Sequence, residues 1–169
     1  CGQRVWLFCF MRQEKGMAGH VIIISNGRLG DLSFFEEKVA QVPERLIICC
    51  DGAAQTLART KIKPDVLIGD MDSLDLSLLS GLRKEGVKII EYPQAKDFTD
   101  TELALDYAVE LRPASVEIWG ALGGRLDHLL ANVFLLRKGE KAKIKMRLID
   151  EYGEAFLPQK EAVFYDAVG

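Results

Sequence analysis

The sequence has few of the residues that mark covalent catalysis, zinc centres or disulfide frameworks. It contains two histidines and four cysteines in 169 residues, and it shows no serine–histidine–aspartate or cysteine–histidine arrangement. Cys49 and Cys50 are adjacent at the end of an apolar run, which is not a zinc-ligand spacing. We therefore expect reduced thiols in a cytoplasmic protein, without a covalent enzyme intermediate.

The chain also lacks a strong net charge and a membrane-length apolar run. Its net charge of −3 gives no basic footprint for nucleic acid or anionic lipid. The apolar run Val5–Phe10 is too short to span a bilayer, and no small-residue cleavage site accompanies it. We expect neither a nucleic-acid partner nor a membrane partner, and the hydrophobic share of 49% is ample for a packed core.

The length and the first residues predict one main domain with additions at both ends. The chain opens with Cys1 rather than Met, and Met17 stands just before the first clear strand-like run. We expect residues 1–16 to be an extension and residues 17–139 to form an α/β catalytic domain.

Strand-like and helix-like segments alternate along residues 17–139. Strands are predicted at His20–Ser25, Arg45–Cys50, Val66–Ile68, Val87–Glu91 and Val116–Trp119. Helices are predicted at Leu32–Gln41, Ala53–Thr60, Leu74–Lys84, Asp100–Leu111 and Leu126–Lys138. Helix starts are predicted at Ser33, Ser73 and Thr99, and helix ends just before Gly86 and Gly139. This alternation predicts an open parallel sheet with helices on both faces.

The pattern changes after Gly139. Lys143–Ile149 alternates charged and apolar residues, Glu151–Glu154 can turn, and Ala155–Leu157 can return antiparallel. Two or three strands cannot enclose a sandwich core by themselves. We therefore predict that residues 140–169 begin a second, all-β domain, and that this β-sandwich segment is truncated.

Acidic residues follow the predicted strands. They are Asp51, Asp70, Asp72, Asp97, Asp100 and Asp127. Because the carboxyl ends of parallel strands meet at one edge, where open α/β sheets bind ligands, we expect these carboxylates to converge. Crowded carboxylates repel each other unless a cation lies among them. With one lysine and one arginine nearby, such a site suits Mg²⁺ and a polyphosphate, which predicts nucleotide-dependent phosphoryl chemistry.

Several of these motifs also have a purely structural interpretation. Asp72 or Ser73 can cap a helix, but capping needs only one of them, whereas Asp70 and Asp72 can converge on one metal. The tight turns Asn26–Gly27 and Asp51–Gly52 can serve the fold alone or can contact a ligand.

The segment Lys96–Asp100 combines a helix start with ligand-binding groups. Thr99 can cap the helix or contact a ligand, and Asp100 in the first turn favours the helix dipole whatever its function. Lys96 adds a donor for a phosphate oxygen.

The loop Gly120–His128 is rich in glycine and leads into a helix. Exposed backbone N–H groups at Gly123 and Gly124, with the positive helix end, form a natural anion site. Arg125 can bind phosphate with two parallel hydrogen bonds, and Asp127 adds a carboxylate. The spacing matches neither the dinucleotide fingerprint nor the P-loop.

In order and spacing, from about Val21 to Asp150, these motifs resemble those of thiamine pyrophosphokinase. The motifs are Asn26–Gly27, Asp51–Gly52, Gly69–Ser73, Lys96–Asp100 and Gly123–His128. The resemblance implies a Rossmann-like catalytic domain followed by a β-sandwich that completes a homodimer. It also implies Mg²⁺-dependent transfer of pyrophosphate from ATP to the thiamine hydroxyl, with release of AMP.

Within that resemblance the candidate residues fall into three groups. Asp70, Asp72 and Asp100 are expected to bind Mg²⁺, directly or through water. Asp97 and Asp127 are expected to orient the metal shell or to accept the proton of the alcohol. The residues expected to contact ATP or substrate are Asn26, Asp51, Gly52, Lys96, Thr99, Gly123, Gly124 and Arg125.

The chain departs from the family pattern in two places. The family usually has Asp-Gly-Gly-Ala-Asn after the second strand, where Asp51–Gln55 has alanine and glutamine instead. The serine-containing strand that closes the family's sandwich has no match in Phe164–Gly169. Two alternatives stay open: a pyrophosphokinase acting on a pterin alcohol, and a nucleotide-binding fragment without catalysis.

Overall fold

The computed structural model describes residues 19–93 and 98–158. The strands are β1 (His20–Ile24), β2 (Arg45–Cys50), β3 (Val66–Gly69), β4 (Lys88–Glu91), β5 (Ser115–Trp119), β6 (Lys145–Ile149) and β7 (Glu154–Phe156). The helices are α2 (Leu32–Ala40), the short 3₁₀ helix η1 (Asp51–Ala53), α3 (Ala54–Leu57), α4 (Leu76–Lys84), α5 (Asp100–Glu110) and α6 (Leu126–Ala142).

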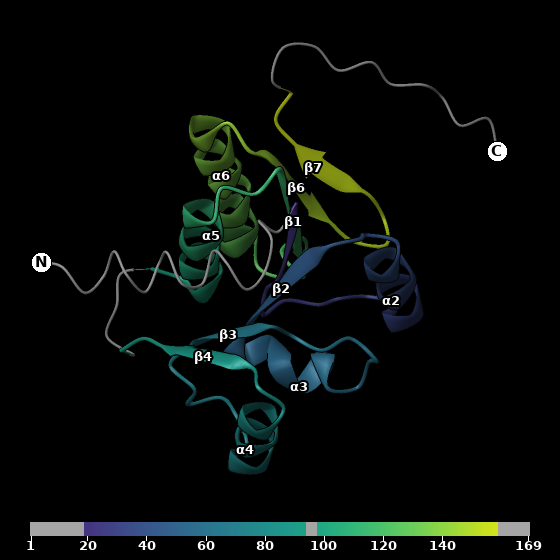
Figure 1. Ribbon diagram of the computed structural model, residues 1–169. Coiled ribbons are helices and arrows are strands. Elements are labelled where there is room, and N and C mark those ends of the chain that lie inside the picture. The colour runs from purple at the N-terminus through teal and green to yellow at the C-terminus, as the bar shows by residue number, and fades with distance from the viewer. Residues whose placement is uncertain (1–18, 94–97, 159–169) are drawn as a thin grey trace, which may run out of the picture.

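All the described strands form one seven-stranded sheet in the order β4-β3-β2-β1-β5-β6-β7 (Figure 1). Neighbouring strands from β4 to β6 pair in parallel, and β7 pairs antiparallel with β6. The central strand β1 lies between β2 and β5 and pairs with both over its whole length. The predicted α/β fold with a parallel sheet is therefore confirmed.

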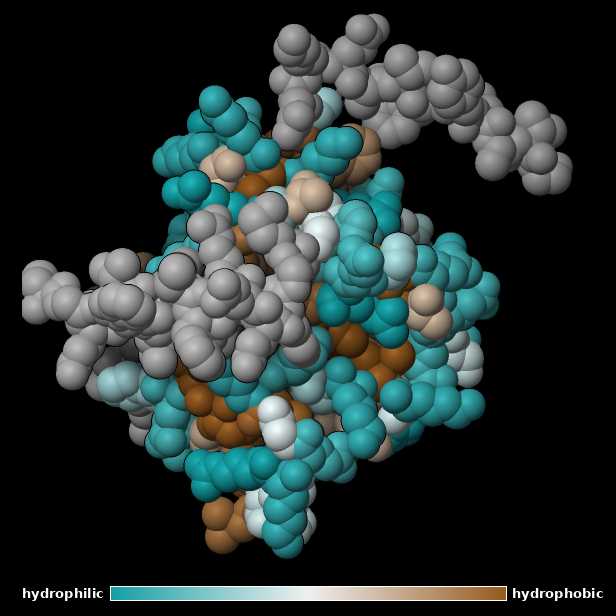
Figure 2. Space-filling view, viewed as in Figure 1, coloured by the Kyte–Doolittle hydropathy of each residue, from teal (hydrophilic) through white to brown (hydrophobic). Residues whose placement is uncertain are grey.

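Alternate residues of β1 pack against opposite layers of helices. Val21 and Ile23 contact the cluster that contains α5 and α6, whereas Ile22 and Ile24 contact the cluster that contains α2, α3 and α4. All four side chains are fully buried, and each such burial stabilises the fold by about 1.5–3 kcal/mol. Figure 2 shows that hydrophilic side chains cover much of the described surface on the side viewed.

The helix starts partly follow the prediction. Thr99 caps α5 as predicted, because its hydroxyl accepts the backbone N–H of Glu102. The predicted starts at Ser33 and Ser73 were wrong: Asp31 caps α2, and Asp75 caps α4. In both loops a carboxylate two residues from the serine accepts the first free N–H groups, which is the stronger interaction.

Helix α6 is longer than predicted. It continues through Gly139 to Ala142, so the predicted end before Gly139 was wrong. Gly139 is a buried residue of this helix, and a larger residue would not fit there because its Cβ would lie 2.8 Å from the Cβ of Met146. The left-handed cap falls on Lys143, with φ 59°. No helix in the described part of the chain is long and apolar enough to cross a membrane.

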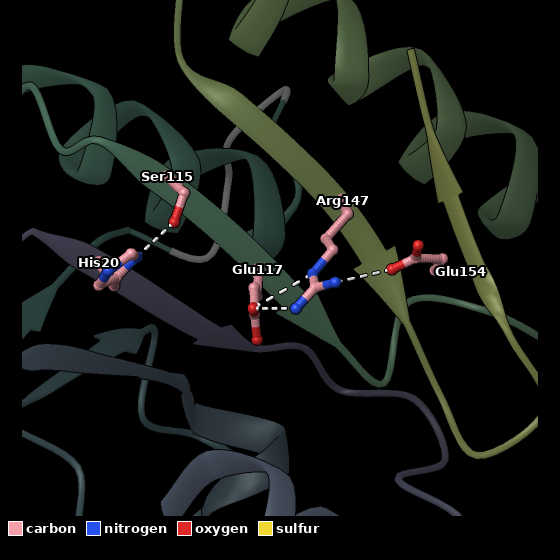
Figure 3. A network of polar contacts seen from close by, with 5 residues as sticks. All are labelled: His20, Ser115, Glu117, Arg147 and Glu154. Atoms are coloured by element: carbon pink, nitrogen blue, oxygen red, sulfur yellow. Dashed lines mark hydrogen bonds and ion pairs between the residues drawn. The ribbon is translucent and has the colours of Figure 1, made fainter. Parts of the chain in front are cut away.

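Strands β6 and β7 form the predicted antiparallel hairpin, but β6 belongs to the main sheet. It pairs in parallel with β5 from Lys145 to Ile149. Arg147 on β6 bridges Glu117 on β5, at 2.5 Å, and Glu154 on β7, at 2.8 Å (Figure 3). β6 was expected to be the first strand of a separate all-β domain, but it is the sixth parallel strand of the main sheet. The division at residue 139 stays a prediction.

We predict that Lys143→Gly stabilises the fold. A left-handed residue with a Cβ is disfavoured, and glycine removes that penalty at the cost of some unfolded-state entropy. The net gain should be about 0.5–1 kcal/mol in the free energy of unfolding, measured from urea titrations. The matched control, Lys141→Gly in the last turn of α6, should destabilise by about 1 kcal/mol. Equal losses of unfolding free energy in both variants would contradict the assignment of Lys143 as the left-handed cap of α6.

Candidate functional site

The candidate site lies along the carboxyl edge of the sheet. Asp51 directly follows β2, Asp70 directly follows β3, and Asp100 is the first residue of α5. The loop from Gly120 to Arg125 joins β5 to α6. Two predicted members, Lys96 and Asp97, lie outside the described residues.

The buried carboxylate of Asp51 joins the ends of β2 and β3. The side chain is 3% exposed. One carboxylate oxygen accepts the N–H of Gly52 at 2.6 Å, and the other accepts the N–H of Met71 at 2.9 Å. A Cβ at Gly69 would lie 2.2 Å from the Asp51 carboxyl carbon. Glycine at position 69 therefore makes room for this carboxylate.

Two further carboxylates surround Asp51. Burial and the negative charge of Asp100 raise the pKa of Asp51, and a side-chain hydrogen bond with Asp70 raises it further. The N–H groups of Gly52 and Met71 lower this pKa but do not cancel the rise. Six carboxylates were predicted to converge, and the structure couples three of them, Asp51, Asp70 and Asp100. Asp127 instead pairs with Arg125.

The turn after β3 holds Asp70 and Asp72 by its backbone. Met71 adopts a left-handed conformation with φ 65° and has a buried side chain. The N–H of Asp72 donates to the Asp70 carboxylate at 3.1 Å, which closes an Asx turn. Asp70 is half-buried, whereas Asp72 is exposed. The two carboxylates therefore occupy different environments within one tight turn.

The loop after β1 contacts the loops of both neighbouring strands. A Cβ at Gly52 would lie 2.1 Å from the amide nitrogen of Asn26, so the Asn26 side chain rests on the Asp51–Gly52 turn. A Cβ at Gly27 would lie 2.1 Å from the carbonyl oxygen of Gly120. These close approaches place Asn26 and Gly52 together, beside the start of the glycine-rich loop.

The glycine-rich loop has an open conformation. Gly123 and Gly124 are exposed with φ 86° and 76°, and a Cβ at either would meet nothing within 4 Å. Arg125 forms two parallel hydrogen bonds to Asp127, at 3.1 and 2.7 Å. The pair raises the pKa of Arg125 and lowers the pKa of Asp127. Arg125 and Asp127, both predicted to contact ligand, are therefore paired with each other in this structure.

The carboxylates fit a magnesium ion that keeps several non-protein ligands. Among the residues that the structure describes, no three histidine, cysteine or carboxylate side chains form a ready-made metal cage. Mg²⁺, however, is usually held by one or two protein carboxylates together with substrate phosphates and water. Burial, the charge of Asp100 and the Asp70 side chain all raise the pKa of Asp51, and a cation beside these carboxylates would favour their charged forms.

Three residues that hold the site loops in place were not predicted from the sequence. Ser25 and Thr101 form a buried side-chain hydrogen bond between the end of β1 and α5. The Asn132 amide on α6 donates to the carbonyl of Ala121 at 2.9 Å. An asparagine within the apolar stretch Leu129–Leu136 was a detectable signal, whereas Ser25 and Thr101 are ordinary in sequence.

Comparison with known sequences identifies relatives of this chain. The profile of the family described as "Thiamin pyrophosphokinase, catalytic domain" matches residues 40–148. Thiamine pyrophosphokinase of Bacillus subtilis is 42% identical over 106 residues, covering 63% of this chain and 50% of the relative. Thiamine pyrophosphokinase 1 of Oryza sativa is 29% identical over 167 residues, covering 86% of this chain and 61% of the relative.

Solved structures of this family share the fold. The crystal structure of thiamine pyrophosphokinase from Bacillus subtilis has a TM-score of 0.65 and 34% identity, covering 78% of this chain and 61% of that one. The enzyme from Geobacillus thermodenitrificans has a TM-score of 0.62 and 31% identity, covering 78% and 59%. The chain thus spans about half to three fifths of the length of these relatives.

We predict that Asp70→Asn stabilises the metal-free chain at neutral pH. The pKa of Asp51 is raised on folding, so its contribution to stability is present below the ordinary value of about 3.9 and is lost as pH rises through the raised native pKa. An asparagine amide can donate a hydrogen bond to the charged Asp51 carboxylate, so this replacement should raise the free energy of unfolding at pH 7 by about 1 kcal/mol, which thermal unfolding would measure. An unchanged pH profile between pH 4 and 7 would contradict the carboxylate coupling.

Proposed function

Because the chain belongs to the thiamin pyrophosphokinase family, we propose that it transfers the pyrophosphoryl group of ATP to the hydroxyl of thiamine. The products are thiamine diphosphate and AMP. The observation that carries this proposal is the position of Asp51 after β2, Asp70 after β3 and Asp100 at the start of α5, along one edge of the sheet. Concentrated negative charge beside a glycine-rich helix entrance suits a magnesium–polyphosphate ligand.

Asp70, Asp72 and Asp100 hold Mg²⁺ in this proposal, directly or through water. When bound, the ion neutralises phosphate charge and orients the transferred group. Asp72 is exposed in the Met71 turn, so its carboxylate can reach a ligand without the cost of breaking a buried contact. Asp51 does not bind the ion in this proposal, because its two carboxylate oxygens accept the N–H groups of Gly52 and Met71. Its role is to orient the metal-binding carboxylates.

Lys96 and Arg125 hold phosphate oxygens in this proposal, with the N–H groups of Gly123 and Gly124. Arg125 must then exchange Asp127 for phosphate, which preserves the two-pronged geometry of the guanidinium contact. The exchange frees the Asp127 carboxylate to orient the metal shell or to accept the alcohol proton, a role it shares with Asp97.

The remaining candidates surround the nucleotide. Asn26, Asp51 and Gly52 lie together and form the nucleotide side of the proposed site. Thr99 already caps α5 through its hydroxyl, so any ligand contact shares that hydroxyl with the cap. We also propose a cytoplasmic protein without nucleic-acid or membrane partners, and the net charge of −3 offers no basic surface for either partner.

The pterin-alcohol alternative is not favoured, because the relatives and structural neighbours described above are thiamine pyrophosphokinases. A nucleotide-binding fragment without catalysis would bind ATP and release no AMP, so a product assay separates it from an enzyme.

We also propose that a second copy of the chain covers one face of α6. Leu126, Leu130 and Phe134 recur every four residues and are 69%, 48% and 68% exposed. Large apolar side chains gathered on one helix face are typical of protein interfaces. The stripe begins beside Arg125, so a homodimer formed through it would also border the candidate site.

Asp72→Asn should abolish most activity while sparing the fold. Loss of one metal-binding charge should lower the rate of AMP and thiamine diphosphate formation by about a hundredfold. Chromatography of both products measures this rate. Asp75→Asn is the matched control, because asparagine caps helices as well as aspartate does and Asp75 caps α4. Near-normal turnover in Asp72→Asn would refute the metal assignment, and absence of AMP from the unaltered chain would refute catalysis.

Replacing Leu130 and Phe134 together by serine should dissociate the proposed dimer. Loss of two apolar anchors should raise the dimer dissociation constant at least about thirtyfold, measured by analytical ultracentrifugation, with the circular dichroism spectrum unchanged. Leu76→Ser, at an 81% exposed position on α4, is the control and should leave the dimer intact. A monomer of 18.9 kDa for the unaltered chain at all concentrations would refute the homodimer.

A further inference from the structure

A buried hydrogen bond joins the loop after β1 to the first turn of α5. The Oγ of Ser25 and the Oγ1 of Thr101 are 2.6 Å apart, although 76 residues separate them in sequence. Ser25 is 4% exposed and Thr101 is 6% exposed. At such depth each hydroxyl needs the other, because an unpartnered buried hydroxyl is destabilising.

Ser25 is a fixed anchor for this bond. Its backbone N–H donates to the carbonyl of Trp119 at 2.8 Å, which extends the pairing of β1 with β5 by one residue. The neighbouring Gly27 packs directly against the backbone of Gly120. The serine hydroxyl therefore projects from backbone that pairs with β5.

Thr101 directly follows Asp100 in the first turn of α5, so a contact that fixes Thr101 also fixes the backbone of Asp100. Asp100 is the first residue of α5, a helix that packs across β1, β2 and β3. The position of its first turn sets where the Asp100 carboxylate lies at the carboxyl edge of the sheet. The bond from Thr101 to the end of β1 fixes that position.

We propose that Thr101 is a positioning residue for cation binding, which acts by fixing Asp100 against Asp51 and Asp70 through its hydrogen bond to Ser25. The inference rests on the proposed function only in taking Asp100 as part of the metal site. Groups that orient metal-binding carboxylates typically change metal affinity by about ten- to hundredfold when they are lost.

The test measures binding of Mn²⁺, without nucleotide, to the full chain by electron paramagnetic resonance. Thr101→Val keeps the shape of the side chain and removes its hydroxyl. It should weaken Mn²⁺ binding about tenfold or more, whereas Thr101→Ser should restore near-normal affinity. Thermal unfolding of the same samples measures the structural cost separately.

A double variant keeps the test decisive if Thr101→Val alone folds poorly. Ser25→Ala combined with Thr101→Val leaves no unpartnered hydroxyl, so stability should largely recover. Mn²⁺ affinity should stay low, because the tether is still missing. Recovery of both stability and affinity in the double variant would overturn the proposal and would make the bond purely structural.

Ser115→Ala is the matched control. The Ser115 hydroxyl hydrogen-bonds His20 at 2.7 Å and also joins β1 to an element distant in sequence (Figure 3). It lies at the opposite, amino edge of the sheet, so its loss should lower stability without changing Mn²⁺ affinity. A similar loss of affinity in Ser115→Ala would overturn the proposal, because general loosening would then explain the effect.

The proposed function and this inference fail in different ways. If the unaltered chain binds Mn²⁺ and Asp72→Asn does not, the metal site stands, and normal affinity in Thr101→Val overturns the positioning role alone. If the unaltered chain binds no Mn²⁺, either alone or together with ATP, the metal assignment and the positioning role are both overturned.

Discussion

The arrangement of the candidate site depends on the buried carboxylate of Asp51. Its two oxygens accept N–H groups from the turn after β2 and the turn after β3, so one side chain fixes the spacing between two loops. That geometry requires a residue without a side chain at Gly69 and accompanies the left-handed backbone of Met71. The Met71 turn in turn sets Asp70 against Asp51. A carboxylate normally avoids burial near other carboxylates, and here backbone donors hold it there.

Strand order explains why the contacts radiate from β1. The chain builds the sheet outward from β1 in one direction through β2, β3 and β4, then crosses to β5 on the other side. Open α/β sheets bind ligands at such a reversal. The loop after β1 consequently has neighbours on both sides, with Asn26 over Gly52 and Gly27 against Gly120. Small residues at these crossings allow backbones to approach closely, and the acidic and glycine-rich motifs thereby share one edge.

Sequence patterns predicted the parts of the molecule governed by local rules. The fully buried strands, the Thr99 cap and the edge shared by Asp51, Asp70 and Asp100 follow from periodicity and from the geometry of parallel sheets. The placement of β6 did not follow. Buried and more exposed residues alternate along β6, as they do in a strand with one solvent-exposed face. The outer neighbour of β6, β7, is only three residues long and covers it poorly. The pairing of Arg125 with Asp127 also escaped prediction, since both residues were assigned to ligands rather than to each other.

Two kinds of residue lie at this edge: some lower the stability of the metal-free chain and others raise it. Asp100 by its charge and Asp70 by its side-chain hydrogen bond raise the pKa of Asp51, so both lower the stability of the metal-free fold at neutral pH. Ser25, Thr101 and Gly69 hold the charges together and stabilise the fold in doing so. A bound cation adds its binding free energy to the stability of the native state, and it acts most strongly where repulsion is greatest. The rigid centre of the sheet is therefore what allows the chain to keep carboxylates close together before any cation binds.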